Sequence, residues 1–218
     1  MAYRILSAGP SRSFPEAHAF LSQAIENGEA LVVIGEDSGN AFAKLSSTKA
    51  CPFVAIELGT ECLGVHTVEP GGDEGSNVLG FARFRLGDSA PSNLVELVKQ
   101  AETNPDALQA AKAAFEAAGL VVAVCGDFPG RIVDRLIRPY YNAALRRLDE
   151  GLASAADMDT TLRLGLGYPE GPIALLERTG LVPHHDVTLA LYQALGSEAY
   201  LPARRAQVAR QRAPVGKR

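Results

Sequence analysis

The stretch DFPGRIVDRLIRPYYNAALRRL, residues 127–148, separates two kinds of sequence. It follows the apolar run LVVAV, residues 120–124, which is typical of a strand buried on both faces of a parallel sheet. Within the stretch, Pro129 suits the first turn of a helix, and apolar residues then recur at spacings of three and four. They predict one helix face, made of Ile132, Val133, Leu136, Tyr140, Ala143, Ala144 and Leu148. No strand is predicted beyond it.

Strands and helices alternate before this stretch. Residues 13–27 predict a helix whose inner face carries Phe20, Leu21 and Ile25, whereas residues 94–98 fit a helix or a strand equally well. Glycines and acids between residues 59 and 77 indicate a loop-rich surface region. The remaining strands are expected over residues 3–8, 30–34, 53–56 and 78–84, and the remaining helices over 41–49 and 104–118. This alternation predicts an α/β sheet with crossover helices.

Only helices are expected after residue 127. Ser154 begins one of them with a capping-box-like sequence, and helices over residues 172–179 and 186–195 are closed by glycines. Pro139 should kink the long helix. The predicted fold class is therefore α/β followed by all-α, with domains at residues 1–126 and 127–218.

The bulk composition excludes several classes of function. A formal net charge of −4 over 218 residues argues against a nucleic-acid partner. No apolar run approaches the ~20 residues of a membrane span, and the N-terminus lacks signal-peptide features, so we expect no membrane partner and a cytoplasmic location. The three cysteines match no metal-ligand spacing, which predicts reduced thiols and no metal site. A solvated tail is expected for six cations near the C-terminus: Arg204, Arg205, Arg210, Arg212, Lys217 and Arg218.

A dinucleotide site in such a sheet would need G-x-G-x-x-G after the first strand, because these glycines let the backbone approach a pyrophosphate. The corresponding turn here is AGPSRSF, residues 8–14. One glycine of three remains, and Pro10 removes an amide that could bind phosphate. The next turn, GEDSG at residues 35–39, carries two carboxylates that would repel a phosphate. These residues do not predict a cofactor.

Two motifs resemble the L-3-hydroxyacyl-CoA dehydrogenase family. Residues 127–136, DFPGRIVDRL, are similar to that family's D-x-P-G-F-[IV]-x-N-R-L, and GLGYPEGP, residues 165–172, is similar to its G-L-G-Y-P-x-G-P. The chain resembles the second half of long 3-hydroxybutyryl-CoA dehydrogenases. The resemblance implies a reduced Rossmann-like parallel-sheet domain, a helical dimerisation and acyl-CoA-facing domain, and a strand at residues 94–98. By the same resemblance, NAD would be the cofactor.

The resemblance also identifies candidate site residues. The family's catalytic histidine is matched by Ala82, whose methyl group cannot exchange a proton, and the glutamate that orients the histidine is matched by Glu96. The family's substrate-binding asparagine is matched by Asp134, and Arg131 replaces a phenylalanine. Glu96 and Asp134 are thus the candidate catalytic positions. The histidines elsewhere, including His66, His184 and His185, are expected to be solvated.

These substitutions predict a degenerate module of fatty-acid or aromatic acyl-CoA oxidation. It would bind a CoA thioester and pair with itself or with an active dehydrogenase domain, without hydride transfer of its own. Leu136, Tyr140 and residues 168–172 are expected at the interface. Two alternatives stay open at this point: an active NAD-dependent dehydrogenase with a rearranged base, and a binding protein for CoA thioesters without catalysis.

Overall fold

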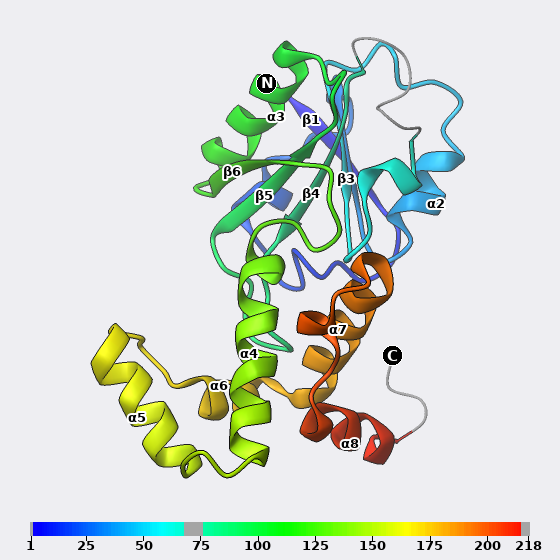
Figure 1. Ribbon diagram of the computed structural model, residues 1–218. Coiled ribbons are helices and arrows are strands. Elements are labelled where there is room, and N and C mark those ends of the chain that lie inside the picture. Colours follow the sequence, from blue (N-terminus) through cyan, green and yellow to red (C-terminus); the bar gives the residue numbers. More distant parts are fainter. Residues whose placement is uncertain (1, 68–75, 215–218) are drawn as a thin grey trace. The chain divides into compact units, whose positions relative to one another are not determined.

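The computed structural model describes residues 2–67 and 76–214 (Figure 1). It divides the chain into two compact units. The sheet unit contains Met1–Arg85 and Pro91–Ile132, and the helical unit contains Leu86–Ala90 and Val133–Arg218. The last strand ends at Gly126, and the chain passes from the sheet unit to the helical unit six residues later, after Ile132.

The six strands of the sheet unit lie side by side in the order of the sequence. The first four pair in parallel, β5 is antiparallel to β4, and β6 is parallel to β5. The strands are β1 (Tyr3–Ser7), β2 (Ala30–Ile34), β3 (Val54–Glu57), β4 (Val78–Arg83), β5 (Leu94–Lys99) and β6 (Val121–Gly126). The mainly parallel sheet confirms the predicted fold class, and the strand at β5 confirms what the family resemblance implied.

Stacked aromatic rings hold one face of the sheet together. Phe20 stacks on Phe115 with ring centroids 4.5 Å apart, and Phe14 stacks on Phe20 at 5.1 Å. Phe81 contacts Phe115 at 5.1 Å, so that rings from distant parts of the sequence meet in one cluster. Aromatic pairs of this kind add about 0.5–1.5 kcal/mol each beyond the area that they bury.

The helices of the sheet unit are shorter than the sequence predicted, except one. The helix expected over residues 13–27 is reduced to α1 (Ala19–Ser22), which His18 caps, and Ile25 is 52% exposed, so its assignment to the inner face was wrong. The helix expected over 41–49 is α2 (Ser38–Ala43). The third helix agrees: α3 (Pro105–Ala117) is capped by Asn104. The loop-rich region contains η1 (Leu63–Val65), and its residues 68–75 lie outside the described residues.

Strand β6 corrects the prediction of a strand buried on both faces. Val121 is 63% exposed and Val124 is also exposed. The reason is that β6 is an edge strand, which pairs only with β5. An apolar run alone does not distinguish a central strand from an edge strand.

The helical unit is built around α4 (Val133–Asp149), which continues across Pro139. Pro129 was expected in the first turn of this helix, but it lies in the turn before it. The buried side also differs from the prediction, because it includes Arg138 and Asn142 while Leu136 is 71% exposed. The other elements are α5 (Ala155–Leu166), α6 (Pro172–Thr179), α7 (Leu181–Leu195), η2 (Glu198–Tyr200) and α8 (Arg204–Arg212).

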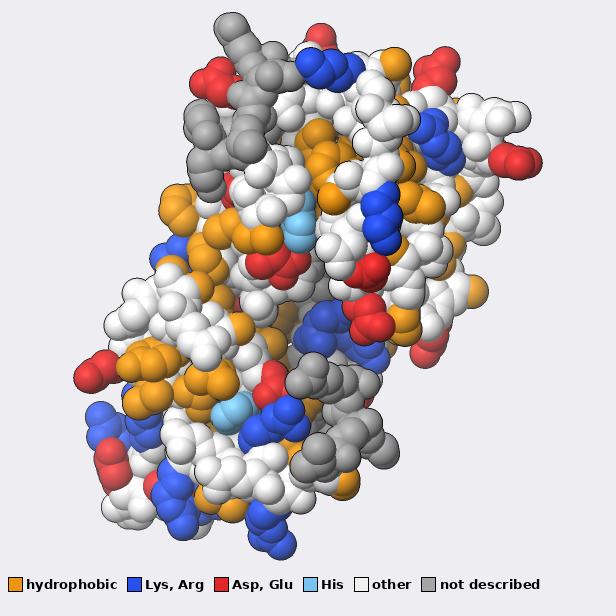
Figure 2. Space-filling model, turned by 90° about the vertical axis from the view of Figure 1, so that its right-hand side faces the viewer, with side chains coloured by type: hydrophobic (Ala, Val, Ile, Leu, Met, Phe, Trp, Pro, Cys, Tyr) orange, Lys and Arg blue, Asp and Glu red, His pale blue; other side chains and the backbone are white. Residues whose placement is uncertain are grey.

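Four of the six cations expected in a solvated tail lie instead in helix α8: Arg204, Arg205, Arg210 and Arg212. Figure 2 shows Lys and Arg side chains among hydrophobic ones on this part of the surface. None of the helices in the described part of the chain is long and apolar enough to cross a membrane.

The glycines of the GLGYPEGP motif end α5 and make room for the cap of α6. Gly167 ends α5 in a left-handed conformation, with φ of 70°. Asp159 in α5 accepts hydrogen bonds from the backbone N–H groups of Ile173 and Ala174, both at 2.9 Å, and so caps the start of α6. Gly171 leaves room for this carboxylate, because a Cβ there would lie 2.2 Å from the Asp159 side chain.

Two glycine substitutions in this region should have opposite effects on stability. Gly171→Ala should destabilise the protein by about 1–3 kcal/mol, because Asp159 must move and the cap of α6 weakens. Gly165→Ala should stabilise it by about 0.5–1 kcal/mol, since Gly165 lies within α5 with nothing within 4 Å of the added methyl group. Urea unfolding of both variants measures the difference, and equal effects would contradict this explanation of the motif.

Candidate functional site

The first turn of the sheet, where a dinucleotide would bind, surrounds a carboxylate of the chain itself. Glu57 ends β3 with its side chain buried. Its Oε1 accepts a hydrogen bond from the Ser13 N–H at 2.6 Å. Its Oε2 accepts from the Gly35 N–H at 2.7 Å and from the Ser11 hydroxyl at 2.8 Å. The donors after β1 and β2 that could hold a phosphate are therefore directed at Glu57.

Two further features of this edge do not fit a dinucleotide. Nucleotides bind in open α/β sheets where the strand order reverses, and the six described strands run in sequence order without a reversal. The hollow beside the turn, about 210 Å³, is lined by three carboxylates, Glu36, Glu57 and Glu61, and by a single cation, Arg12. A pyrophosphate would meet like charge here, so these residues do not fit the cofactor in the usual mode.

The place of the family's histidine is filled in a different way. Ala82 in β4 lies directly opposite Glu96 in β5, so both side chains lie on the same face of the sheet. Both are buried. Glu96 accepts a hydrogen bond from the Ile132 N–H at 2.8 Å, and its carboxylate lies 3.7 Å from Nε of Arg131. Glu96 is thus buried rather than solvated, and it is the counterion of Arg131.

Arg131 is held under strain. Its backbone has φ of 50°, a left-handed conformation that is uncommon for residues other than glycine. The guanidinium donates a hydrogen bond to the carbonyl oxygen of Gly59, whereas Nε and Nη1 are buried without a hydrogen-bond partner among the described residues. Leaving such donors unpaired costs about 1–3 kcal/mol each, so the ion pair with Glu96 must offset much of that cost.

Asp127 fastens the start of the motif to the sheet. Its carboxylate accepts hydrogen bonds from the N–H groups of Leu63 at 2.6 Å and Gly64 at 2.8 Å, at the start of η1. Gly130 donates to the carbonyl oxygen of Thr60 at 3.0 Å.

The nearby Cys125 has a pKa raised to about 11 by burial and by Glu96, so it is not a thiolate nucleophile at neutral pH.

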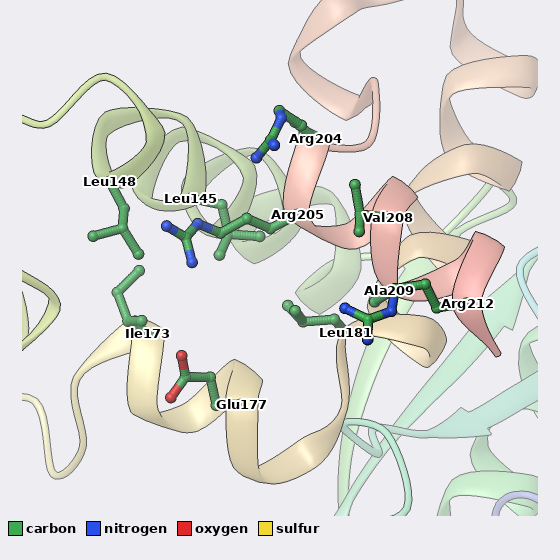
Figure 3. A pocket seen from close by; sticks show the side chains of 10 residues that line it. All are labelled: Leu145, Leu148, Ile173, Glu177, Leu181, Arg204, Arg205, Val208, Ala209 and Arg212. Atoms are coloured by element: carbon green, nitrogen blue, oxygen red, sulfur yellow. The ribbon is translucent and has the colours of Figure 1, made fainter.

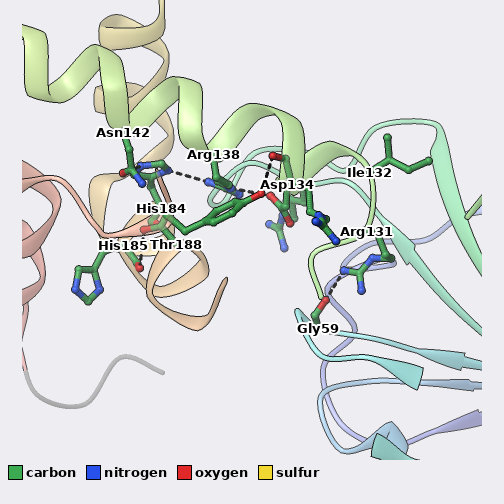
Figure 4. Close-up of polar contacts among 12 residues, drawn as sticks. Gly59, Arg131, Ile132, Asp134, Arg138, Asn142, His184, His185 and Thr188 are labelled. Carbon is green, nitrogen blue, oxygen red and sulfur yellow. Dashed lines mark hydrogen bonds and ion pairs between the residues drawn. The ribbon is translucent and has the colours of Figure 1, made fainter. Parts of the chain in front are cut away.

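In the helical unit, the partly buried Asp134 is at one end of a chain of polar groups that runs into the interior (Figure 4). Arg138, 1% exposed, donates from Nε to Asp134 at 2.7 Å, and its Nη1 lies 3.1 Å from Nδ1 of His184. Because arginine only donates, His184 carries its proton on Nε2 and donates to Oδ1 of Asn142 at 3.0 Å. Asn142 donates in turn to the carbonyl oxygen of Ala199. Asp134 is therefore the counterion of Arg138.

His184 corrects the prediction of a solvated histidine. It is 1% exposed, and burial lowers its pKa to about 3, with smaller contributions from the charge of Arg138 and from His185. The imidazole is therefore neutral at ordinary pH. It connects α4 to α7 as a structural group.

The structure places the two candidate catalytic carboxylates in different units, and each pairs with an arginine of its own unit: Glu96 with Arg131, and Asp134 with Arg138. Sequence reasoning missed Glu57 and Arg138. One signal was available for Glu57, since an acid at the end of an apolar strand run is unusual. Arg138 also stands out, because it is charged within the spacing of a buried helix face.

Comparisons with known proteins agree with this architecture. The family model for the 3-hydroxyacyl-CoA dehydrogenase C-terminal domain matches residues 130–217. This stretch of the chain is therefore similar to the C-terminal domain of 3-hydroxyacyl-CoA dehydrogenases. The resemblance inferred from the two motifs is confirmed.

Among curated relatives, the human mitochondrial hydroxyacyl-coenzyme A dehydrogenase is 41% identical over 102 residues, which cover 46% of this chain and 32% of the relative. A probable 3-hydroxybutyryl-CoA dehydrogenase of Bacillus subtilis is 26% identical over 188 residues, which cover 84% of this chain and 65% of the relative. The matched part of the chain thus spans about a third to two thirds of these relatives.

Solved structures of the family share the fold. The 3-hydroxybutyryl-CoA dehydrogenase of Escherichia coli K12 superposes with a TM-score of 0.70 at 25% identity, covering 89% of this chain and 41% of that one. The (S)-3-hydroxybutyryl-CoA dehydrogenase of Ralstonia eutropha gives a TM-score of 0.67 at 22% identity, covering 83% of this chain and 64% of that one.

The buried pair of Arg131 and Glu96 should show strong energetic coupling. Glu96→Gln should destabilise the protein by about 3–5 kcal/mol, because it leaves a buried guanidinium without a counterion. The double variant Glu96→Gln with Arg131→Met should be more stable than the sum of the two single effects predicts. A double-mutant cycle from urea unfolding measures this coupling, and additivity within about 0.5 kcal/mol would contradict the pairing.

His184 should make the stability fall in acid. Its pKa is about 3 in the folded state, below the ordinary 6.5, so between these values the unfolded state binds a proton that the folded state does not. Stability from this group is complete above pH 6.5 and is lost as the pH falls toward 3, at up to about 1.4 kcal/mol per pH unit. Urea unfolding between pH 7 and pH 4 measures the free energy of unfolding as a function of pH. This free energy should fall less steeply with decreasing pH for His184→Gln than for the unchanged protein, and identical slopes would refute the assignment.

Proposed function

We propose that this chain is a degenerate 3-hydroxyacyl-CoA dehydrogenase-like module of fatty-acid or aromatic acyl-CoA oxidation. It binds a CoA thioester and pairs through its helical unit, and it transfers no hydride by itself. Its partner is a second copy or an active dehydrogenase domain.

The observation that carries this proposal is the buried carboxylate of Glu57, which accepts three hydrogen bonds in the turn where the cofactor's phosphates would lie. Three positions singled out by the family resemblance support it. Ala82 offers no base, and the carboxylates of Glu96 and Asp134 are each neutralised by an arginine. A paired, anionic Asp134 cannot donate a hydrogen bond to a thioester carbonyl.

The decisive test of activity is oxidation of NADH by acetoacetyl-CoA, followed by absorbance. The purified chain should give no rate above background, while an active 3-hydroxyacyl-CoA dehydrogenase serves as the positive control. Turnover at an ordinary rate for the family would overturn the proposal. Thermal stabilisation by acetoacetyl-CoA but not by NADH is expected for the binding role.

The alternative is an active NAD-dependent dehydrogenase that oxidises a 3-hydroxyacyl-CoA with a rearranged base. One observation favours it: Nε2 of His66 lies 3.4 Å from Glu61, a histidine–carboxylate pair within the sheet unit. If turnover is found, His66→Ala should lower it by about 10²- to 10⁴-fold, as expected for loss of a general base.

Exposed apolar side chains support the pairing role. Helix α5 buries none of its residues, and Leu164 in it is 81% exposed. Leu136 in α4, Leu166 at the end of α5 and Tyr168 after it are also exposed. Large exposed apolar side chains that lie close together in the sequence, as around the end of α5, are candidates for an interaction surface.

Pairing can be tested by light scattering. The chain should be a dimer at micromolar concentration, and Leu136→Glu should shift it toward monomer by placing a charge in an apolar contact. Val121→Glu is the matched control, because Val121 is similarly exposed but belongs to the sheet unit. A monomeric wild type at high micromolar concentration would count against self-pairing.

A further inference from the structure

Four helices of the helical unit line an open hollow of about 450 Å³, and none of its lining residues belongs to the sheet or to the two family motifs. Figure 3 shows side chains from α4, α6, α7 and α8 around it. This volume lies in the usual range of pockets for small ligands.

The floor of the hollow is apolar. Leu145 and Leu148 come from α4, Ile173 from α6 and Leu181 from α7. Leu145 and Ile173 are each 1% exposed and belong to the packed core of the unit, so the floor is fixed. An alkyl chain placed against it would gain about 0.8 kcal/mol for each CH₂ group that it buries.

The other wall is cationic. Helix α8 contributes Arg204, Arg205 and Arg212, which share one side of the helix with Val208 and Ala209. Among the described residues that line the hollow, Glu177 is the one acid. Both Arg204 and Arg205 share a single carboxylate, that of Asp149, at 3.8 and 2.7 Å, and Arg212 forms no ion pair within the described residues. Positive charge is therefore in excess.

The first turn of α8 adds to this excess. The free N–H groups at a helix start favour negative charge, yet α8 begins with two arginines, has no acid in its first turn, and follows Ala203, which has no capping side chain. Such a sequence is locally unfavourable, and departures of this kind concentrate at functional sites. An anion bound beside Arg204 and Arg205 would relieve it.

We propose that this hollow binds a single-chain aliphatic anion. The hydrocarbon lies on the floor formed by α4, α6 and α7, and a carboxylate or phosphate head lies against the arginines of α8. The site is independent of hydride transfer and of the pairing surface proposed above.

Calorimetry with sodium decanoate tests this site. We expect saturable binding of decanoate, comparable binding of decyl phosphate, and none of acetate or of uncharged decyl maltoside at the same concentrations. Methyl resonances of Leu148 and Val208 should shift during the titration. Absence of saturable decanoate binding, or equal binding of acetate, would refute the proposal.

Three variants locate the ligand. Arg212→Ala should weaken decanoate binding about three- to fivefold, as expected for a partly exposed ion pair, and Arg212→Glu should weaken it further. Val208→Trp should block the hollow, and Arg212→Glu keeps the test valid if that variant folds poorly. Arg163→Ala, a change at an exposed arginine of α5 outside the hollow, should leave binding unchanged. Binding that survives both Arg212→Glu and Val208→Trp would overturn the assignment.

Discussion

The carboxylate of Glu57 joins the ends of three parallel strands through the hydrogen bonds that it accepts from Ser11, Ser13 and Gly35. In a dinucleotide-binding sheet, donors in these turns would serve a phosphate. Here they stabilise the free chain, because a buried carboxylate is tolerated only when several donors satisfy it. The same contact gives the sheet edge its structure and makes it a poor site for a second anion.

Two further buried or partly buried charges, Arg131 and Asp134, are also paired with groups of the chain itself. Both are among the positions singled out by the family resemblance, and each has an opposite charge within its own unit. Buried ion pairs rarely add much net stability, but removing one partner is costly. The two pairs, Arg131 with Glu96 and Arg138 with Asp134, thus help to maintain the structure of this chain, and none of their four charges can be removed alone without cost.

The sequence predicted the larger architecture well, for physical reasons. The continuous apolar runs at β2 and β3 and the cap and stop residues of α3, α5 and α6 predict those elements locally. The prediction from sequence failed where the environment of a segment depends on which other segments pack against it. Whether residues 120–124 are central or at an edge depends on which strands exist beyond them, and the buried side of α4 depends on a polar chain that reaches His184. The role of Glu57 could not be predicted, because it depends on two turns, after β1 and after β2, that the fold brings to the end of β3.

The backbone N–H groups of Ser13 and Gly35 report directly on whether Glu57 takes the donors that a cofactor's phosphates would need. Their amide resonances should be followed by two-dimensional NMR while NADH is added to millimolar concentration. Both resonances should stay unchanged, since both groups already donate to Glu57. Saturable shifts of these two amides would contradict it.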